Sequence, residues 1–520
     1  MVTTKNNQPI ITIGNRYSSV DNLPYGASTA LYDHVSYDVP GAEWVIATKP
    51  GWDGKKHLFK KNKREPSQGT FLTGLLSYVA EFIYKEFGLI PKVVDNRKKP
   101  EKNLNIQWND KKYSLREYQS KVVSNCIEKS RGIIECATGG GKTIIVAKII
   151  QELGVSPFIF YVLTKDLMYQ SQERLQDAMP GTKIGIIGDG NCDIQDINIM
   201  TVQTATRAYD KDLKADLKKE EDIDEEELQQ IKEEDLSHIE KRKQDITNLV
   251  ENAVGIYFDE AHHAPCATAK DIILLSPNAY YTFGGSATPC REDNADLLLE
   301  GLFGKKRCHI TASFLISEGF LVRPDIYFIK LSKEAERVDT YNEDYEKNIV
   351  ENIERNNHII SIAKSLTERK LPTMILVRRV DHGKYLAEKI PGARFVYGDS
   401  AKKHRKDSLK EFADREFPVL VATVIADEGL DIPILSALVL AGGGKSKTRC
   451  KQRIGRVIRK HKDKKCALVF DFIDNGRWVR KHSHRRKKIL EEESEFNIKV
   501  LKSFKSEPTE PEAPKKGLLF

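Results

Sequence analysis

Three consecutive glycines followed by a lysine and a threonine limit most strongly what this chain can fold into. The segment Cys136 to Thr143 reads CATGGGKT, and it lies between the apolar run Gly132 to Ile134 and the helix-like stretch Ile144 to Ile150. Because glycines lack a Cβ atom, the backbone N–H groups of such a turn can converge on phosphate oxygens. The following helix adds the positive end of its dipole. The pattern predicts a phosphate-binding loop at a strand-to-helix turn.

Each residue of this loop has an expected role. Gly139, Gly140 and Gly141 would bind phosphate through their backbone, Lys142 would reach the β- and γ-phosphates of ATP, and Thr143 would hold Mg²⁺. The segment departs from the pattern GxxxxGK[ST], since Cys136 occupies the first glycine position. An ordinary glycine-rich turn is the alternative, because short motifs also match by chance.

A pair of carboxylates follows a second strand-like run. Asp259 and Glu260 open the sequence DEAH directly after Gly255 to Phe258. A carboxylate at the end of a strand can hold the Mg²⁺ ion opposite Thr143, and its neighbour can orient the attacking water. We assign the metal to Asp259 and water activation to Glu260. Without the phosphate loop, a solvated loop would be the default interpretation of this pair.

Arginines near the end of the chain complete the expected catalytic set. The run Gln452 to Arg459 follows the earlier triplet Ser286 to Thr288, and its arginines Arg456 and Arg459 are three positions apart. On a helix this spacing puts both on one face, so both could point at one γ-phosphate. An arginine of this kind accelerates phosphoryl transfer by roughly 10³ to 10⁵. The alternative is a basic helix that faces solvent or DNA.

The order of these motifs resembles that of the superfamily-two helicases and translocases. The resemblance implies that the segment Leu115 to Gln119 reads adenine, with Gln119 on the base, and that ATP and Mg²⁺ are the cofactors. It also implies further site residues in the motifs VLTKDLMYQ, TVQT, ATVIADEGLDIP and QRIGRVIR. Nucleic-acid contacts would come from Thr164, Lys165, Thr201, Gln203 and Thr423, and nucleotide contacts from Gly429, Asp431 and Gln452.

Strand-like and helix-like segments alternate through most of the chain, which is typical of parallel, doubly wound sheets. The predicted fold class is α/β, with two RecA-like parallel-sheet lobes at residues 113–320 and 321–475 after a small α/β domain at residues 1–105. A charged stretch at residues 211–244 holds 13 acids and 8 bases. It is expected to be a solvated helical insertion, or else a partner-binding arm.

The N-terminal domain is predicted from four segments. They are a strand at Ile10 to Ile13, a helix near Ala30, a strand at Trp44 to Ala47 and an amphipathic helix from Phe71 to Phe87. The turn Gly51-Trp52-Asp53-Gly54, followed by lysines, suggests a hairpin that presents positive charge. A purely structural turn is the alternative.

This turn, ahead of a DExH motor, resembles the N-terminal domain of the UvsW-type phage helicases, which act on branched DNA. The resemblance implies a domain that engages duplexes or junctions. Its DNA contacts would be Trp52, Lys55 and Lys56, with Lys60 and Lys61 also on phosphates.

Charge and cysteine usage restrict the class of protein further. The chain has 520 residues, and 83 Lys and Arg against 75 Asp and Glu give a net charge of +8, a mild excess compatible with a nucleic-acid partner. Its 8 cysteines form no CxxC pair, which favours reduced thiols. No apolar run approaches the roughly 18 residues of a membrane span. We therefore expect a cytoplasmic protein without membrane contact, in the host cytoplasm if a phage encodes it.

The C-terminal residues separate into a basic extension at 476–505 and a flexible tail at 506–520. Seven of the 12 residues from Arg477 to Lys488 are Lys or Arg, which is typical of a phosphate-binding surface or of a solvated helix. The acidic, proline-rich tail ends in Leu518, Leu519 and Phe520. That ending is similar to the peptides by which replication proteins bind sliding clamps; self-docking or no function is the alternative.

Together these features predict an ATP-dependent DNA helicase or translocase. It would unwind or branch-migrate forks, Holliday junctions and displacement loops in recombination, repair or replication. One alternative is a motor subunit of a restriction or excision-repair complex. Another is a nucleotide-gated DNA-binding or clamp adaptor, which the presence of Lys142, Glu260 and both arginines disfavours.

Overall fold

The computed structural model describes residues 8–43, 51–209, 233–288, 295–398, 402–423, 432–464 and 466–504. The chain divides into two compact units, Met1–Cys136 with Gly141–His309 and Ala137–Gly140 with Ile310–Phe520. The predicted strand at Trp44 to Ala47, residues 211–232 of the insertion, and the tail from 506 lie outside the described residues. In the part of the chain that the structure describes, no helix is long and apolar enough to cross a membrane.

The N-terminal region forms a mixed sheet with strand order β5-β6-β2-β1-β7. Its strands are β1 (Ile10–Ile13), β2 (Tyr17–Asp21), β5 (Phe59–Lys61), β6 (Gly69–Leu72) and β7 (Lys92–Asp95). Two helices, α1 (Ala27–His34) and α3 (Leu76–Phe87), bury Leu31, Val79 and Ile83 in the same core as Phe59 and Phe71 of the sheet. The predicted helix from Phe71 begins only at Leu76, because residues 69–72 pair with β2 as a strand.

This small sheet shares one hydrophobic core with the first lobe. The Arg16 guanidinium donates to the Leu274 carbonyl at 2.5 Å, and Asn15 Nδ2 donates to the Pro277 carbonyl at 3.0 Å. At Gly74 a Cβ atom would come within 2.0 Å of the Glu300 carbonyl oxygen, so the two regions touch too closely there for any side chain. Residues 1–105 therefore belong to the first compact unit.

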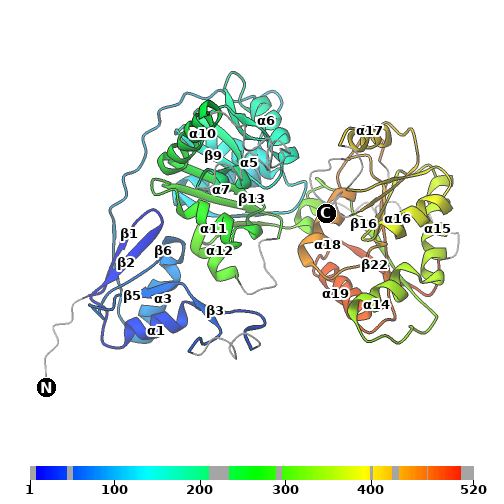
Figure 1. Cartoon of the computed structure of the whole chain (residues 1–520), viewed down its shortest axis with the longest axis horizontal. Helices are drawn as coiled ribbons and strands as arrows, with labels where there is room; N and C mark the ends of the chain where they lie inside the picture. Colours follow the sequence, from blue (N-terminus) through cyan, green and yellow to red (C-terminus); the bar gives the residue numbers. More distant parts are fainter. Residues whose placement is uncertain are drawn as a thin grey trace, which may run out of the picture. The chain divides into compact units, whose positions relative to one another are not determined.

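The first lobe is an eight-stranded sheet with order β11-β10-β12-β9-β13-β14-β8-β15. Figure 1 labels strands β9 and β13 of this sheet. The pairs from β10 to β8 are parallel. The strands are β8 (Arg131–Cys136), β9 (Phe158–Val162), β10 (Ile184–Gly188), β11 (Asn191–Cys192), β12 (Ile197–Thr201), β13 (Gly255–Asp259), β14 (Tyr281–Ser286) and β15 (Lys306–Ile310). The helices are α4 (Glu117–Lys129), α5 (Lys142–Leu153), α6 (Lys165–Ala178), α7 (Val202–Ala208), α10 (Glu233–Asn252), α11 (Ala267–Leu274) and α12 (Asp296–Phe303). This confirms the predicted α/β class with parallel sheets.

The second lobe is a seven-stranded sheet with order β18-β19-β17-β20-β21-β16-β22 (Figure 1), and its recorded strand pairs are parallel. The strands are β16 (Pro324–Lys330), β17 (Thr373–Val377), β18 (Ala393–Val396), β19 (Val419–Thr423), β20 (Ala437–Val439), β21 (Ala467–Ile473) and β22 (Asn497–Leu501). The helices are α13 (Ala312–Ser317), α14 (Tyr341–Tyr345), α15 (Ile353–Glu368), α16 (Val380–Lys389), α17 (Lys402–Ala413), α18 (Lys447–Val457) and α19 (Val479–Glu491).

Two features of the structure bear on the predicted domain boundaries. Strand β22 pairs with β16 along residues 325–329, so residues 497–501 add an edge strand to the second sheet. The first compact unit ends at His309, whereas the sequence places the end of the first lobe at residue 320. Strand pairing between distant segments is not visible in local sequence pattern, so the sequence alone could not place β22.

Candidate active site

The phosphate loop begins where β8 ends and stops where α5 begins at Lys142. Gly139 has a φ of +88° and Gly141 a φ of +82°, a left-handed conformation that glycine adopts at little cost. Gly141 is the N-cap of α5, and no side chain caps that end of the helix. The first N–H groups of a helix without such a cap are suited to bind phosphate, so the loop fits the polyphosphate of a nucleotide.

Cys136 explains the departure from the glycine-first pattern. It is the last residue of β8 and is only 1% exposed. Burial raises the pKa of its thiol to about 11, so the side chain stays neutral beside the loop. The first position of the motif is therefore the buried end of strand β8 in this chain. A small, neutral side chain such as that of Cys136 fits there in place of glycine.

The predicted catalytic residues of the first lobe lie together. Lys142 Nζ is 2.9 Å from Asp259 Oδ1 and 3.2 Å from Glu260 Oε1. Burial opposes the charge of Lys142, but the two carboxylates outweigh it and raise the pKa of the ammonium well above its usual value. Burial also opposes the charge of Glu260, and here Lys142 and His262 lower the pKa of the carboxyl. Lys142 and Glu260 are therefore ionised near neutral pH.

Neighbouring strands connect this cluster to the triplet Ser286 to Thr288. His262 Nδ1 lies 3.1 Å from Ser286 Oγ and 3.4 Å from Glu260 Oε2, and the Ser286 hydroxyl accepts from the Thr288 amide at 3.1 Å. Strands β13 and β14 are paired in parallel, so their carboxyl ends meet at one edge of the sheet. His262 and Ser286 had no predicted role, although His262 lies in the DEAH segment and Ser286 opens the triplet Ser286 to Thr288.

Tyr257 is a second residue that sequence reasoning missed. Its hydroxyl donates to Asp259 Oδ1 at 3.1 Å, and a Cβ atom on Gly285 would lie within 1.9 Å of that hydroxyl oxygen. Burial and the nearby carboxylates raise the pKa of Tyr257 well above its usual value, so the phenol remains a donor. Tyr257 thus fixes one oxygen of the carboxylate expected to hold Mg²⁺.

Gln119 lies against the phosphate loop. Its side chain is 5% exposed, and its Oε1 atom accepts from the Arg116 amide at 3.0 Å, at the start of α4. A Cβ atom on Gly141 would come within 2.4 Å of Gln119 Nε2. The structure thus brings Gln119 and Gly141 together, and contact of Gln119 with a base stays a prediction.

The expected nucleic-acid contacts of the first lobe follow two neighbouring strands. Thr164 caps α6 after β9, and Thr201 caps α7 at the end of β12; each hydroxyl accepts from a backbone amide at 3.3 Å. Lys165 forms an ion pair with Asp189, and Gln203 is exposed on the first turn of α7. These residues share one edge of the sheet, because β9 and β12 are parallel neighbours.

In the second lobe the structure corrects one argument about the arginines. Helix α18 ends at Val457, so Arg456 is helical, whereas Arg459 follows the helix and forms a β-bridge with Leu321. The two arginines therefore do not share a helix face. Gln452 lies on α18 and Thr423 ends β19, while Gly429 and Asp431 lie outside the described residues.

In the N-terminal region the Trp52 turn is held by its own side chains. Trp52 Nε1 donates to the Lys55 carbonyl at 2.9 Å, and Asp53 Oδ2 lies 2.8 Å from His57 Nε2. Lys55 and Lys56 lie on β4 (Lys55–His57), which pairs with β3 (Ser36–Asp38). Lys60 and Lys61 instead lie on β5, so the four lysines occupy two sheets.

Two family models match the chain. Residues 112–291 match the model described as type III restriction enzyme, res subunit, and residues 354–461 match the helicase conserved C-terminal domain. The first match contains the phosphate loop, Asp259 and Glu260, and the second contains Arg456 and Arg459.

Three curated proteins are similar to the chain. A protein of the Sulfolobus islandicus filamentous virus, described by its name as a helicase, is 32% identical over 48% of this chain and 47% of its own length. The DNA 3'-5' translocase XPB2 of Sulfurisphaera tokodaii is 26% identical over 72% of this chain and 85% of its own length. The ATP-dependent DNA helicase uvsW of Enterobacteria phage T4 is 29% identical over 45% of this chain and 48% of its own length.

The chain thus spans about half the length of the viral helicase and of uvsW, and most of XPB2. The restriction-enzyme model matches the first lobe and the helicase C-terminal model matches the second. The chain belongs to the superfamily-two helicases, with two RecA-like lobes.

Proposed function

We propose that this chain is an ATP-dependent DNA translocase that remodels branched DNA, such as forks, four-way junctions and displacement loops. The observation that carries the proposal is the cluster of Lys142, Asp259 and Glu260 beside a phosphate loop whose glycines have the required backbone conformation. Support for DNA as the partner comes from relatives whose names describe a DNA translocase and a DNA helicase.

The chemistry of the donor set supports the proposal that the site binds Mg²⁺ and ATP. The amides of Gly139 to Gly141 and the ammonium of Lys142 would hold the phosphates, while Thr143 and Asp259 would hold the metal. When bound, the metal would neutralise charge on the phosphates. The phosphates would then replace Asp259 and Glu260 as partners of Lys142, which would leave Glu260 able to orient water.

Nucleic acid would bind along the edge that carries Thr164, Lys165, Thr201 and Gln203, and Thr423 would add a contact from the second lobe. Closure of the lobes on ATP would place Arg456 and Arg459 at the γ-phosphate, and hydrolysis would release them. Alternation between these two states would move the strand.

Preference for branched DNA would come from the N-terminal sheet, with Trp52, Lys55, Lys56, Lys60 and Lys61 on the duplex. The shared hydrophobic core supports this part of the proposal, because a domain packed rigidly on a motor lobe can transmit its movement to bound duplex. Recombination, repair or replication would be the setting, in the cytoplasm of the host cell. Clamp binding through Leu518, Leu519 and Phe520 stays a prediction, since these residues lie outside the described part.

A second candidate is a motor subunit of a restriction complex. The description of the family model that matches residues 112–291 favours it. A motor of this kind would need a partner subunit for activity on DNA.

The test is ATP-dependent conversion of a synthetic four-way junction, beside a partial duplex, at several salt concentrations. We expect activity on the junction to persist at salt concentrations that abolish activity on the partial duplex. Equal loss on both substrates would contradict a preference for branched DNA. Failure on both, with DNA-stimulated ATP hydrolysis intact, would favour the restriction subunit.

A further inference from the structure

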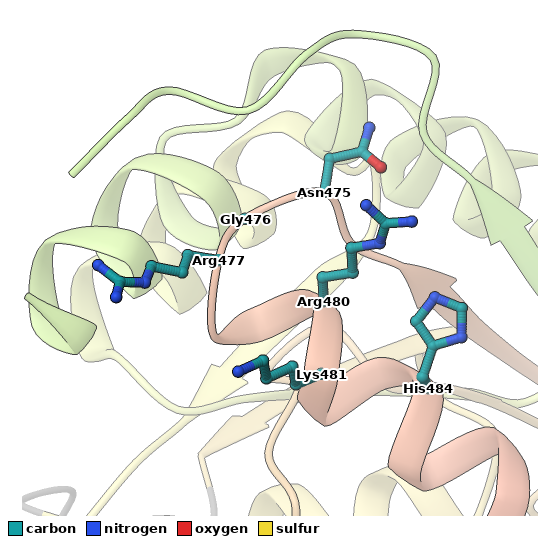
Figure 2. Close-up of a pocket in the computed structure, with 6 residues that line it drawn as sticks. All are labelled: Asn475, Gly476, Arg477, Arg480, Lys481 and His484. Carbon is teal, nitrogen blue, oxygen red and sulfur yellow. The ribbon is translucent and has the colours of Figure 1, made fainter. Parts of the chain in front are cut away.

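Helix α19 of the second lobe has two faces of opposite character. Its buried face carries Val479, Ser483, Arg486, Ile489 and Leu490. The other face exposes Arg480, Lys481, His484 and Lys488. Lys481, His484 and Lys488 are spaced by three and four residues, which on a helix places them on successive turns about 5.4 Å apart, and Arg480 lies beside Lys481. Figure 2 shows Arg480, Lys481 and His484 projecting from this helix beside the loop of Asn475 and Gly476.

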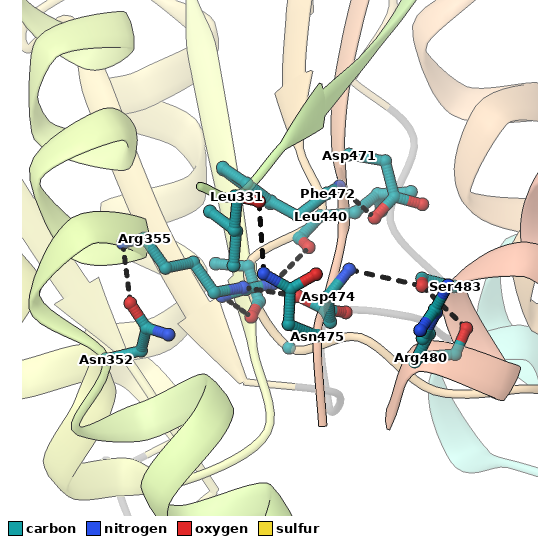
Figure 3. A network of polar contacts seen from close by, with 12 residues as sticks. Leu331, Asn352, Arg355, Leu440, Asp471, Phe472, Asp474, Asn475, Arg480 and Ser483 are labelled. Atoms are coloured by element: carbon teal, nitrogen blue, oxygen red, sulfur yellow. Dashed lines mark hydrogen bonds and ion pairs between the residues drawn. The ribbon is translucent and has the colours of Figure 1, made fainter. Parts of the chain in front are cut away.

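The buried face is held by charged groups of its own lobe. The Arg486 guanidinium donates to both oxygens of Asp471 at 2.8 Å and lies 3.6 Å from Asp474. The Ser483 hydroxyl accepts from the Asp474 amide at 3.2 Å, as Figure 3 shows. These contacts fix the rotation of the helix, and with it the direction in which the exposed cations point.

The N-terminus of α19 is already occupied by a carboxylate. Asp344 Oδ2 accepts from the amides of Trp478 and Val479 at 2.6 and 3.0 Å, and Asp344 is fully buried. A ligand of the exposed face must therefore bind to the side chains of that face and not to the N-terminal amides of α19. Asp344 already interacts with the positive end of the helix dipole, so this end of α19 needs no further anion.

The exposed face borders a depression lined by Asn475, Gly476, Arg477, Arg480, Lys481 and His484. Arg477 stacks on the Trp478 ring at 4.7 Å, which holds its guanidinium at the rim. Asn475 Nδ2 donates to the carbonyls of Leu331 and Lys333 at 3.0 and 2.6 Å. None of the six lining residues is acidic, so the depression is complementary to an anion.

Acidic side chains near the other end of α19 are engaged elsewhere. Glu491 pairs with Lys487, and Glu492 and Glu493 pair with Lys447 and Lys451 of α18. Within the described ranges, no carboxylate forms an ion pair with Arg480, Lys481 or Lys488. Arg480, Lys481 and Lys488 thus present three positive charges along one face of a helix whose orientation is fixed by contacts within its lobe. This arrangement is complementary to the repeated negative charge of a sugar-phosphate backbone.

We propose that the exposed face of α19, with Arg477, Arg480, Lys481, His484 and Lys488, binds the phosphate backbone of the DNA on which the motor acts. The site is a second contact in the second lobe, apart from Thr423 on β19. It rests on the proposed function, since it names a further surface for the same partner. Contacts of this kind set affinity and position without reading sequence.

The test compares two triple variants of the full chain. Arg480→Gln/Lys481→Gln/Lys488→Gln removes three charges from the proposed surface and keeps good helix formers. Lys364→Gln/Lys389→Gln/Lys410→Gln removes three charges from exposed positions on α15, α16 and α17 of the same lobe. Binding to a duplex of mixed sequence is measured without ATP at several salt concentrations. ATP hydrolysis without DNA and the thermal unfolding midpoint check that each variant is folded.

We expect the α19 variant to bind DNA about tenfold more weakly or worse. The plot of log affinity against log salt concentration should become shallower, its slope decreasing in magnitude by about 3. The control should keep the slope of the unaltered chain. Equal slopes for both variants would overturn the proposed surface and leave the motor proposal standing. Binding of inorganic phosphate alone, lost in the α19 variant while its DNA slope stays unchanged, would assign the depression to a free anion instead. No DNA binding by the unaltered chain would overturn the proposed function itself.

Discussion

The two lobes each place a cation against carboxylates near the end of a central strand, but they differ in access to solvent. In the first lobe Lys142 and Asp259 are 2.9 Å apart, and their side chains are 15% and 14% exposed. In the second lobe Arg355 and Asp474 are 3.0 Å apart and fully buried. The two ion pairs have the same chemistry but differ in burial, which decides whether a ligand can replace one of the partners.

The physical reason lies in what can replace each partner. A partly buried cluster can exchange its carboxylates for phosphate and metal, because a ligand can reach it and solvent lowers the cost of the unpaired state. A fully buried pair has no such exchange, and loss of one partner leaves an uncompensated charge. Arg355 also donates to the Ala441 carbonyl at 2.7 Å, which adds to the fixed network. The first cluster fits catalysis, whereas the second holds α15 on the sheet.

The largest effect is expected from Glu260→Gln in the partly buried cluster of the first lobe. Turnover of ATP in the presence of DNA should fall by about 10² to 10⁴, because the group that orients water loses its charge. Thermal unfolding should change little. Phosphate release and the unfolding midpoint are the two measurements. Equal turnover in the variant and the unaltered chain would remove the catalytic role of Glu260.

The buried pair should respond in the opposite way. Arg355→Met should lower the free energy of unfolding by about 3 to 5 kcal/mol, since it leaves Asp474 charged without its main partner. Urea unfolding measures this loss. The control is Arg355→Met/Asp474→Asn, which removes both charges and should recover part of the stability. If the single variant is as stable as the unaltered chain, the buried pair is not what holds α15.

Acid should weaken the second lobe through His382. This residue on α16 is 1% exposed, and its Nε2 atom lies 2.8 Å from Asn356 Oδ1. Burial and the charge of Arg355 lower the pKa of the imidazole to about 3. The unfolded chain therefore binds a proton below its ordinary pKa while the folded chain does not, so this group destabilises the protein as the pH falls from about 6.5 toward 3.

The expected loss of unfolding free energy from His382 is about 2 kcal/mol at pH 5. Urea unfolding at pH 7 and pH 5 would measure it, beside His382→Gln, whose amide keeps a hydrogen-bond donor and does not titrate. A smaller difference between the two pH values is expected in this variant. The same pH dependence in both proteins would assign the acid response to other groups.

The smallest effect on stability is expected at Lys165. Its ion pair with Asp189 is between side chains 56% and 25% exposed, so Lys165→Ala should change the free energy of unfolding by less than about 1 kcal/mol. Affinity for DNA should still fall, with a decrease of about 1 in the salt slope. A stability loss without any change in DNA binding would make Lys165 a structural residue.

More of the site in the first lobe than of the second lobe could be predicted from the sequence. The expected site residues of the first lobe lie at the end of a strand or directly after one: the phosphate loop, Asp259, Glu260, Thr164 and Thr201. Residues at the carboxyl ends of parallel strands meet at one edge of the sheet. The second lobe depends more on pairs that are distant in the chain. Arg355 and Asp474 are 119 positions apart, and no local pattern joins them.

By itself, the sequence determined the phosphate loop, the carboxylate pair, the helicase motifs and the α/β class, because each rests on local residue order. Only the tertiary structure decided that Arg459 lies beyond the end of α18, that β22 completes the second sheet and that the N-terminal sheet shares the core of the first lobe. It also decided which ion pairs are buried. Helix ends, sheet partners and burial depend on contacts between distant segments, whose free energy exceeds local preference.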